Sequence, residues 1–226
     1  MSKITYNLLA TGSTGNCLIL NEFLALDLGV AFKKIKPYYK DLKLVFISHE
    51  HSDHLNKSCV KTLARERPTI RWAVGKWLVP ILLECGVQKQ NIDIIEAPKI
   101  YDYKICKISP IVLYHDCEIY GLRIFIGNEK AIFITDTCTV EGIVAKDYQW
   151  YFVEANYGEE EIQERIQEKQ KNGQYCYELR TIKTHLSLEQ ASAFLLENMR
   201  KDSEYVFLHQ HKEKRKKTED WDYNDT

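Results

Sequence analysis

Short apolar runs, rich in β-branched and aromatic residues, recur along the chain with turn residues between them. Runs of this kind, separated by turn residues, are typical of β-strands. The pattern predicts strands at Ile4–Leu9, Cys17–Leu20, Leu24–Leu28, Leu44–Ile47, Ile70–Val74, Ile92–Ala97, Ile105–Tyr114, Ile119–Ile126, Ala131–Thr135, Gln149–Glu154 and Glu204–Leu208.

Four other segments have helical character: Ser58–Arg67, Trp77–Cys85, Glu159–Lys171 and Leu188–Lys201. The third is almost wholly polar, which predicts an exposed helix. In the fourth, Leu188, Ala191, Leu195 and Leu196 occupy positions i, i+3, i+7 and i+8, as in an amphipathic helix. Many strands with a few interspersed helices predict an α/β (α+β) chain whose sheets are covered by helices.

The chain has 226 residues, of which 45% are hydrophobic, enough for one sizeable core. No linker or internal repeat interrupts it, so we predict a single domain over residues 1–211. Residues 212–226 change composition, with basic Lys212–Lys217 followed by acidic residues, and we interpret them as a charged, exposed tail. The net charge of −1 does not indicate a nucleic-acid binder, so any basic surface must be local.

Seven cysteines are scattered along the chain, and no two form a C-x-x-C pair. An odd number without pairing predicts reduced thiols rather than a secreted disulfide framework. The first residues lack the apolar segment of a signal peptide, and no apolar run approaches the ~20 residues of a membrane span. We therefore expect a cytoplasmic protein without a membrane partner.

Potential metal-binding side chains are most concentrated directly after the apolar strand Leu44–Ile47, in the segment Ser-His-Glu-His-Ser-Asp-His that ends at His54. Three of the chain's seven histidines and two acids fall within six residues there. A solvated polar turn does not account for this density, whereas neutral imidazoles are good ligands for divalent metals. The segment therefore predicts a metal site.

An H-x-H-x-D-H sequence after a strand resembles the signature of the metallo-β-lactamase superfamily, and the resemblance extends along nearly the whole chain. Four further residues match in order and spacing, each at the end of a predicted strand: Asp27, His115, Asp136 and His209. The resemblance implies the four-layer αβ/βα sandwich of that superfamily, with two divalent metal ions held at one edge.

The resemblance also implies the role of each residue. The first metal would be held by His49, His51 and His115, the second by Asp53, His54 and His209, and Asp136 would bridge them. The ions would lie about 3.5–4 Å apart, and Asp27 would orient the histidine loop by accepting a hydrogen bond. Nitrogen-rich ligation favours zinc, with manganese or iron(II) as alternatives. His211 is the alternative to His209, because the chain reads Leu-His-Gln-His there.

Three accessory segments bear on the substrate. Thr11–Cys17 resembles the S-G-S-S-G-N-C segment of the YycJ/WalJ branch, whose characterised members are DNA exonucleases. Phe152–Tyr157 resembles that branch's E-A/S-N segment and also the H-E-A-T motif of ribonuclease Z. Thr184–Glu189 resembles the G-H-L-S-N-E motif of the YycJ/WalJ branch, with threonine in place of the glycine. In the phosphodiesterase members a glutamate and a histidine at these places form a proton-donating pair.

The resemblance thus implies a nuclease whose catalytic residues include Asp53, Glu154 and His185, with DNA or RNA as the substrate. Simpler interpretations remain: Glu154 as a surface acid, and His185 in the approach to a helix capped by Ser187. The rival functions are a phosphodiesterase of small cyclic nucleotides or another small ester, and a non-catalytic binding module. The oligomeric state is left open.

Other residues have weaker claims. Cys117 and Cys138 lie beside predicted ligands, but buried inert thiols are the commoner case. Three of the tryptophans, Trp72, Trp77 and Trp150, lie in apolar segments and are expected in the core rather than stacked on bases. The chain lacks a large insert and the long flexible arm of ribonuclease Z, which disfavours tRNA processing.

Overall fold

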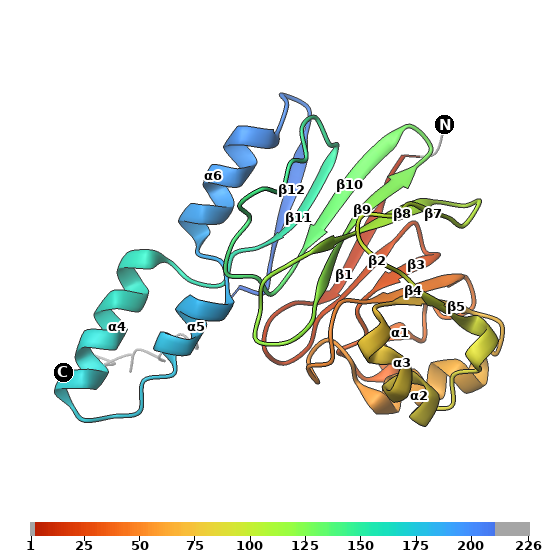
Figure 1. Ribbon diagram of the computed structural model, residues 1–226, viewed down its shortest axis with the longest axis horizontal. Helices are drawn as coiled ribbons and strands as arrows, with labels where there is room; N and C mark the ends of the chain where they lie inside the picture. The colour runs from red at the N-terminus through yellow and green to blue at the C-terminus, as the bar shows by residue number, and fades with distance from the viewer. Residues whose placement is uncertain (1–2, 211–226) are drawn as a thin grey trace, which may run out of the picture.

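Two six-stranded β-sheets pack face to face, and helices lie against their outer faces (Figure 1). The computed structural model describes residues 3–210; His211 and the predicted tail over 212–226 lie outside the described residues. The predicted fold class, a mixed α/β sandwich, is confirmed. In the described part of the chain no helix combines the length and the apolar character that crossing a membrane requires.

The first sheet is built by the N-terminal half in simple chain order, β1 to β6. Its first three strands are antiparallel neighbours, and the remaining pairs are parallel. The strands are β1 (Tyr6–Ala10), β2 (Cys17–Leu20), β3 (Leu24–Leu26), β4 (Leu44–Ile47), β5 (Arg71–Val74) and β6 (Ile92–Ile94).

The second sheet has the order β12-β11-β10-β9-β8-β7. Strands β7 to β10 are antiparallel neighbours, whereas β10, β11 and β12 run parallel. The strands are β7 (Tyr101–Asp102), β8 (Lys107–Val112), β9 (Tyr120–Ile126), β10 (Glu129–Ile134), β11 (Trp150–Glu154) and β12 (Glu204–Leu208).

Helices fall into three groups. The first sheet carries α1 (Phe32–Ile35), α2 (Lys57–Glu66) and α3 (Val79–Glu84), with short 3₁₀ turns at Lys76–Leu78 and Lys89–Asn91. The second sheet is covered by α6 (Leu188–Asn198). Figure 1 shows α4 (Glu159–Lys171) and α5 (Glu178–Thr184) standing away from the sandwich, and we call these two helices and their connection the α4–α5 arm.

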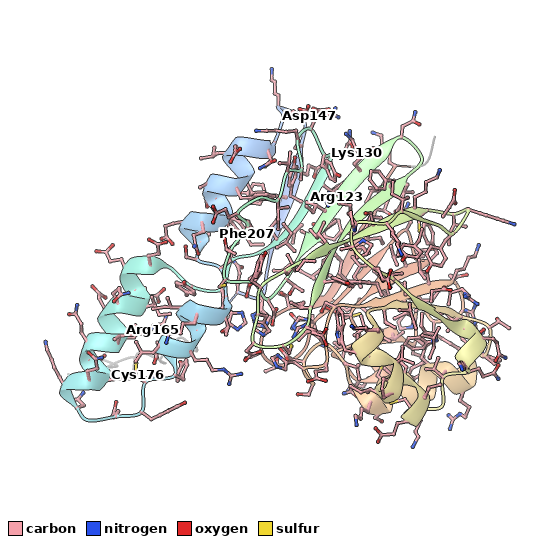
Figure 2. The ribbon with its side chains drawn as sticks, viewed as in Figure 1. Arg123, Lys130, Asp147, Arg165, Cys176 and Phe207 are labelled. Carbon is pink, nitrogen blue, oxygen red and sulfur yellow. The ribbon has the colours of Figure 1, made fainter. Side chains whose placement is uncertain are left out.

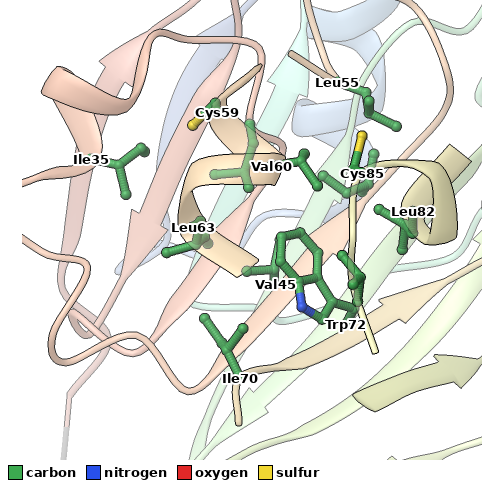
Figure 3. Packing of buried hydrophobic residues seen from close by; sticks show 14 of the residues in the cluster. Ile35, Val45, Leu55, Cys59, Val60, Leu63, Ile70, Trp72, Leu82 and Cys85 are labelled. Atoms are coloured by element: carbon green, nitrogen blue, oxygen red, sulfur yellow. The ribbon is translucent and has the colours of Figure 1, made fainter. Parts of the chain in front are cut away.

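Three buried apolar clusters correspond to the three interfaces between layers. Successive side chains of a strand point to opposite faces of the sheet, so alternate residues of the same strand belong to two different clusters. In β4, Val45 joins Trp72 and helix α2 on the outer face (Figure 3), whereas Phe46 enters the cluster between the sheets. Tyr151 of β11 packs with α6 in the third cluster. Strands buried on both faces explain the unbroken apolar runs.

The predicted strands and helices are found with small shifts of their ends, but one strand and two α-helices were missed and one helix face was wrong. The short strand β7 and the helices α1 and α5 were not predicted. Helix α6 buries Ala191, Phe194 and Leu195, while Leu196 is 86% exposed and Leu188 39% exposed. The buried residues Ala191, Phe194 and Leu195 occupy positions i, i+3 and i+4, so they form the face that packs on the sheet. Leu196 lies about 100° around the helix from Leu195 and therefore points away from that face.

Candidate active site

The predicted site residues follow strand ends at one edge of the sandwich. Asp27 comes directly after β3 and His49 two residues after β4 in the first sheet. His115 follows β8, Asp136 follows β10 and His209 follows β12 in the second. Both sheets therefore contribute side chains to a common cluster.

The first group of possible ligands joins the two sheets. His49, His51, His115 and Asp136 each offer an atom within 4.8 Å of the others. Nδ1 of His51 lies 3.4 Å from Nε2 of His115, and Nε2 of His49 lies 3.7 Å from Oδ2 of Asp136. Three imidazoles and one carboxylate are a donor set that suits a divalent transition metal.

A second group shares one member with the first. Asp53, His54, Asp136 and His209 also offer atoms within 4.8 Å of one another. Oδ1 of Asp136 lies 3.3 Å from Nε2 of His54, and Oδ2 of Asp53 lies 3.3 Å from Nε2 of His209. Because one carboxylate has two oxygens, Asp136 can serve both groups.

Outer hydrogen bonds orient the imidazoles. His54 donates from Nδ1 to Asp27 Oδ2 at 2.6 Å, and His115 donates from Nδ1 to the Thr184 carbonyl at 2.8 Å. Asp27 also accepts from the backbone N–H and the hydroxyl of Ser48, whose oxygen lies 2.9 Å from Nδ1 of His49. A proton on Nδ1 leaves the Nε2 lone pair of each ring free for a metal.

His49 gives the clearest sign that the cluster is built for a cation. Its side chain is fully buried, and Nε2 has no hydrogen-bond partner. Burial, together with the neighbouring His54, lowers the pKa of His49, so the ring is neutral at physiological pH. A buried imidazole nitrogen without a partner is costly unless a ligand satisfies it. A metal ion fits this nitrogen and the charges around it.

The carboxylate shared by the two groups is held in its charged form. Burial alone raises the pKa of Asp136, but the neighbouring His54 and His209 outweigh this and keep the pKa well below its usual value. The Thr135 hydroxyl donates to Oδ1 at 2.7 Å. Asp136 is therefore a buried anion that needs positive charge beside it.

Three of these residues have strained backbones. Asp27, Asp136 and His209 have φ angles of 61°, 41° and 52°, in the left-handed region that residues with side chains seldom adopt. Each such residue costs on the order of 1–3 kcal/mol, and such residues concentrate at functional sites. The bends turn three side chains into the cluster at the ends of β3, β10 and β12.

Two asparagines hold the second group and were not assigned roles from the sequence. The side-chain amide of Asn16 donates to the Asp53 carbonyl at 3.2 Å and lies 2.9 Å from Nε2 of His54. The amide of Asn156 lies 2.7 Å from Nδ1 of His209. Both belong to the small motifs around Thr11–Cys17 and Phe152–Tyr157, so their positions, though not their contacts, could be found in the sequence.

Glu154 and His185 form a pair beside the second group. His185 donates from Nδ1 to Glu154 Oε1 at 2.5 Å. Glu154 is fully buried, and its other oxygen accepts from the backbone N–H of Thr137 at 2.9 Å. The His185 ring stacks on His209 at 5.0 Å between centroids. The interpretation of Glu154 as a surface acid is wrong, because the side chain is buried.

Known proteins resemble the chain along most of its length. An exodeoxyribonuclease, WalJ of Streptococcus pneumoniae, is 28% identical over 92% of this chain and 82% of its own length. YhfI of Bacillus subtilis, a metallo-β-lactamase-fold protein, superposes with a TM-score of 0.71 over 92% of this chain and 87% of its own, at 14% identity. Human tRNase Z, short form, superposes with a TM-score of 0.66 over 91% and 92% of the two chains, at 12% identity. The chain has the metallo-β-lactamase fold. It matches no protein-family model.

In this metallo-β-lactamase-fold chain the cluster opens into a cavity of about 250 Å³. Helix α5, which was not predicted, forms one wall of it. The lining residues are Ser13, His51, Asp53, His115, Asp116, Asp136, Tyr177, Arg180, Thr181, Thr184, His185 and His209. The cavity therefore joins members of both ligand groups to the Glu154–His185 pair through His185.

Asp116 is a further acid that the sequence did not single out. Its Oδ1 lies 3.2 Å from Nε2 of His115 and 3.4 Å from Nε2 of His51, and its Oδ2 accepts from Arg180 of α5. Cys117 can be grouped with His51 and Asp116, but partial burial raises the pKa of its thiol to about 11, so the thiol is protonated. All seven cysteines, including Cys138, are free thiols.

Proposed function

We propose that this chain is a dinuclear metal-dependent phosphodiesterase that hydrolyses nucleic acid. The observation that carries the proposal is the arrangement of the cluster: two four-residue groups share Asp136, and the Glu154–His185 pair stands directly beside them. A shared carboxylate suits two ions, and a histidine backed by a buried glutamate suits proton transfer.

In this proposal the first ion is held by His49, His51, His115 and Asp136, and the second by Asp53, His54, His209 and Asp136. The unpartnered Nε2 of His49 and the charged state of Asp136 support the assignment. Asp27 orients the histidine loop through Ser48 and His54. Counting each residue once, the two groups contain seven donors, five of them imidazoles. Nitrogen-rich ligation of this kind favours zinc over manganese or iron(II).

The bound cations would supply Lewis acidity at the phosphoryl oxygens. The chain's own residues do the rest. Hydrolysis adds one water molecule across the P–O bond: the water oxygen bonds to phosphorus and the bond to the leaving oxygen breaks. His185 is placed to donate a proton to that leaving oxygen, because it lines the cavity and its Nδ1 is held by Glu154. Glu154 keeps the ring oriented through this hydrogen bond. Asp53, which also lines the cavity, completes the proposed catalytic set.

Phosphodiester chemistry is favoured over other hydrolyses by two independent supports. The Glu154–His185 pair supplies a proton to a poor leaving group, which a nucleic-acid strand requires. The relative WalJ is named as an exodeoxyribonuclease, and human tRNase Z shares the fold. The free thiols of all seven cysteines fit a cytoplasmic setting.

A hydrolysis panel with Zn²⁺ and Mn²⁺ tests the proposal. It compares bis-p-nitrophenyl phosphate, labelled single- and double-stranded DNA, RNA and cyclic nucleotides. We expect hydrolysis of nucleic-acid strands and of bis-p-nitrophenyl phosphate. Activity confined to cyclic nucleotides would replace the proposal with the small-ester function. A protein that takes up no metal and hydrolyses nothing would be a non-catalytic binding module.

A further inference from the structure

Helix α5 presents one polar face to the cavity. Tyr177, at its N-cap, and Arg180, Thr181 and Thr184 lie at positions i, i+3, i+4 and i+7, and all four line the cavity. Residues at this spacing share one side of a helix. The helix is anchored to the site, because the Thr184 carbonyl accepts the hydrogen bond from His115.

Charge makes Arg180 the distinctive residue of this wall. Among the described residues that line the cavity, it is the one lysine or arginine, beside the acids Asp53, Asp116 and Asp136. Two of these acids are proposed metal ligands. Asp116 belongs to neither of the two proposed ligand groups, and its carboxylate accepts from the Arg180 guanidinium.

The guanidinium is both positioned and available. Its side chain is 70% exposed, so it is not committed to the interior. A guanidinium has five N–H donors in a fixed fork, and Asp116 occupies only part of them. The remaining donors suit a phosphate, for which arginine has matching geometry.

Tyr177 adds an aromatic surface to the same wall. Its side chain is 44% exposed, and the ammonium of Lys169 in α4 lies 3.9 Å from the ring centroid. Lys169 also forms a 2.6 Å ion pair with the buried Glu178, which fixes α4 against α5. An exposed aromatic ring beside an arginine is the combination on which single-stranded nucleic acid binds, by base stacking and phosphate contact.

We propose that the cavity face of α5 is the strand-binding wall of the enzyme, where Arg180 binds a phosphate next to the scissile one and Tyr177 stacks on a base. Asp116 is a positioning residue that keeps Arg180 turned toward the cavity. The inference rests on the proposed phosphodiesterase function and deepens it: the substrate is a polynucleotide strand rather than a cyclic mononucleotide, which has no neighbouring phosphate to offer.

The experiment compares Arg180→Ala with Lys183→Ala in the metal-loaded protein. Lys183 is exposed on the same helix, carries the same charge and is outside the cavity lining. We expect Arg180→Ala to raise KM for a single-stranded 12-mer about 10- to 100-fold, the range for a charge-assisted hydrogen bond. Lys183→Ala should change it less than about 3-fold. Arg180→Ala should affect KM for bis-p-nitrophenyl phosphate, which has a single phosphodiester group, much less than KM for the strand.

Chemical changes to the strand make the test specific. A neutral methylphosphonate at the neighbouring linkage should weaken binding to the wild type but not further weaken binding to Arg180→Ala. Tyr177→Ala should weaken binding of the normal strand about 5- to 100-fold, and an abasic nucleotide should remove that difference. Tyr175→Ala, at a tyrosine that is 85% exposed and outside the lining, is the matched control.

A binding measurement separates this inference from the proposed function. Fluorescence anisotropy with a labelled phosphorothioate 12-mer reports Kd without turnover. If the wild type binds the strand through Arg180 but cleaves no phosphodiester, the strand-binding wall stands and the proposed reaction fails. If the wild type cleaves DNA or RNA and Arg180→Ala behaves like Lys183→Ala, the wall is wrong and the reaction stands.

Discussion

At the scale of single residues, His185 and Glu154 separate chemistry from metal binding. His185 is held by its hydrogen bond to Glu154 and belongs to neither of the two proposed ligand groups. We expect His185→Ala to keep its metal and to hydrolyse a nucleic-acid strand about 10²–10⁴ times more slowly, the range for losing a general acid. Elemental analysis and turnover measured on the same samples check both parts.

The partner residue and the leaving group provide the controls. Glu154→Gln should also be slow, and the double variant little slower than His185→Ala, since the two act as one unit. A substrate that releases p-nitrophenolate needs little protonation and should lose much less activity. Equal losses on both substrates, or loss of metal from His185→Ala, would remove the proton-donating role.

His209 makes a second prediction at this scale. Its Nε2 lies 3.3 Å from Asp53 Oδ2, and its backbone N–H donates to the Thr11 hydroxyl at 2.5 Å, so the residue is held within the second group. His209→Ala should weaken binding of one ion, measured by titration calorimetry with Zn²⁺. His211→Ala is the matched control, and a larger effect of that variant would transfer the ligand role to His211.

At the scale of elements, the turn that contains Gly29 packs directly against the histidine loop at Asp53. A Cβ added to Gly29, after β3, would lie 1.6 Å from the Asp53 carbonyl oxygen, too close for the loop to stay in place. We expect Gly29→Ala to lower the free energy of unfolding by about 1–3 kcal/mol, as overpacking does, and to weaken the second ion. Urea unfolding and metal titration measure the two effects.

A matched glycine tests whether the effect is local. At Gly158, before α4, an added Cβ meets nothing closer than 3.7 Å, so Gly158→Ala introduces the same methyl group without a clash. This variant should keep its stability within about 0.5 kcal/mol. Similar losses in both variants would mean that Gly29 is sensitive for a reason other than its contact with Asp53.

Elements also show what the sequence could predict. The histidine segment after β4 could be predicted, because β4 is buried on both faces and therefore appears in the sequence as an unbroken apolar run, and three histidines follow it closely. Helix α5 could not be predicted, because its seven residues show no apolar periodicity. Its buried residues, Glu178 and Thr184, are both polar. The strand-binding wall was missed with it. Arg180 meets Asp116 across 64 residues of chain, a contact that no local pattern predicts.

The resemblance predicted the metal ligands themselves, but it did not predict the two asparagines that contact them. Asn156 contacts His209 across 53 residues, and Asn16 contacts His54 across 38. Both asparagines stand in motifs that the sequence singled out, but each partner lies in a different loop at the edge of the same sheet. Tertiary pairing, rather than local propensity, decides such contacts, and only the fold brings them together.

At the scale of the whole molecule, the proposed ions would connect the two sheets. His49, His51, Asp53 and His54 follow β4 of the first sheet, whereas His115, Asp136 and His209 follow strands of the second. Without cations, the buried charge of Asp136 and the unpartnered nitrogen of His49 face one another across that interface. We therefore expect bound metal to stabilise the native sandwich, because the unfolded chain has no such preformed site.

Metal content and thermal stability should change together in the native protein. We expect about two divalent ions per chain. Ligand at 100 times its Kd contributes about 2.7 kcal/mol per site, so removal of the ions by a chelator should lower the Tm by roughly 5–10 °C or more. Elemental analysis and calorimetry measure the two quantities, and readdition of Zn²⁺ should restore the Tm. A native protein without metal, or an unchanged Tm on chelation, would contradict the proposed site.

Two carboxylate variants then distinguish a shared ligand from a single-site ligand. Asp136 belongs to both groups, so Asp136→Ala should lose most of both ions and become insensitive to chelator. Asp53 belongs to the second group alone, so Asp53→Ala should retain close to one ion per chain and part of the metal-dependent rise in Tm. Because each variant removes one carboxylate, the difference between them measures sharing rather than loss of charge. Equal metal content in the two variants would assign Asp136 to one ion only.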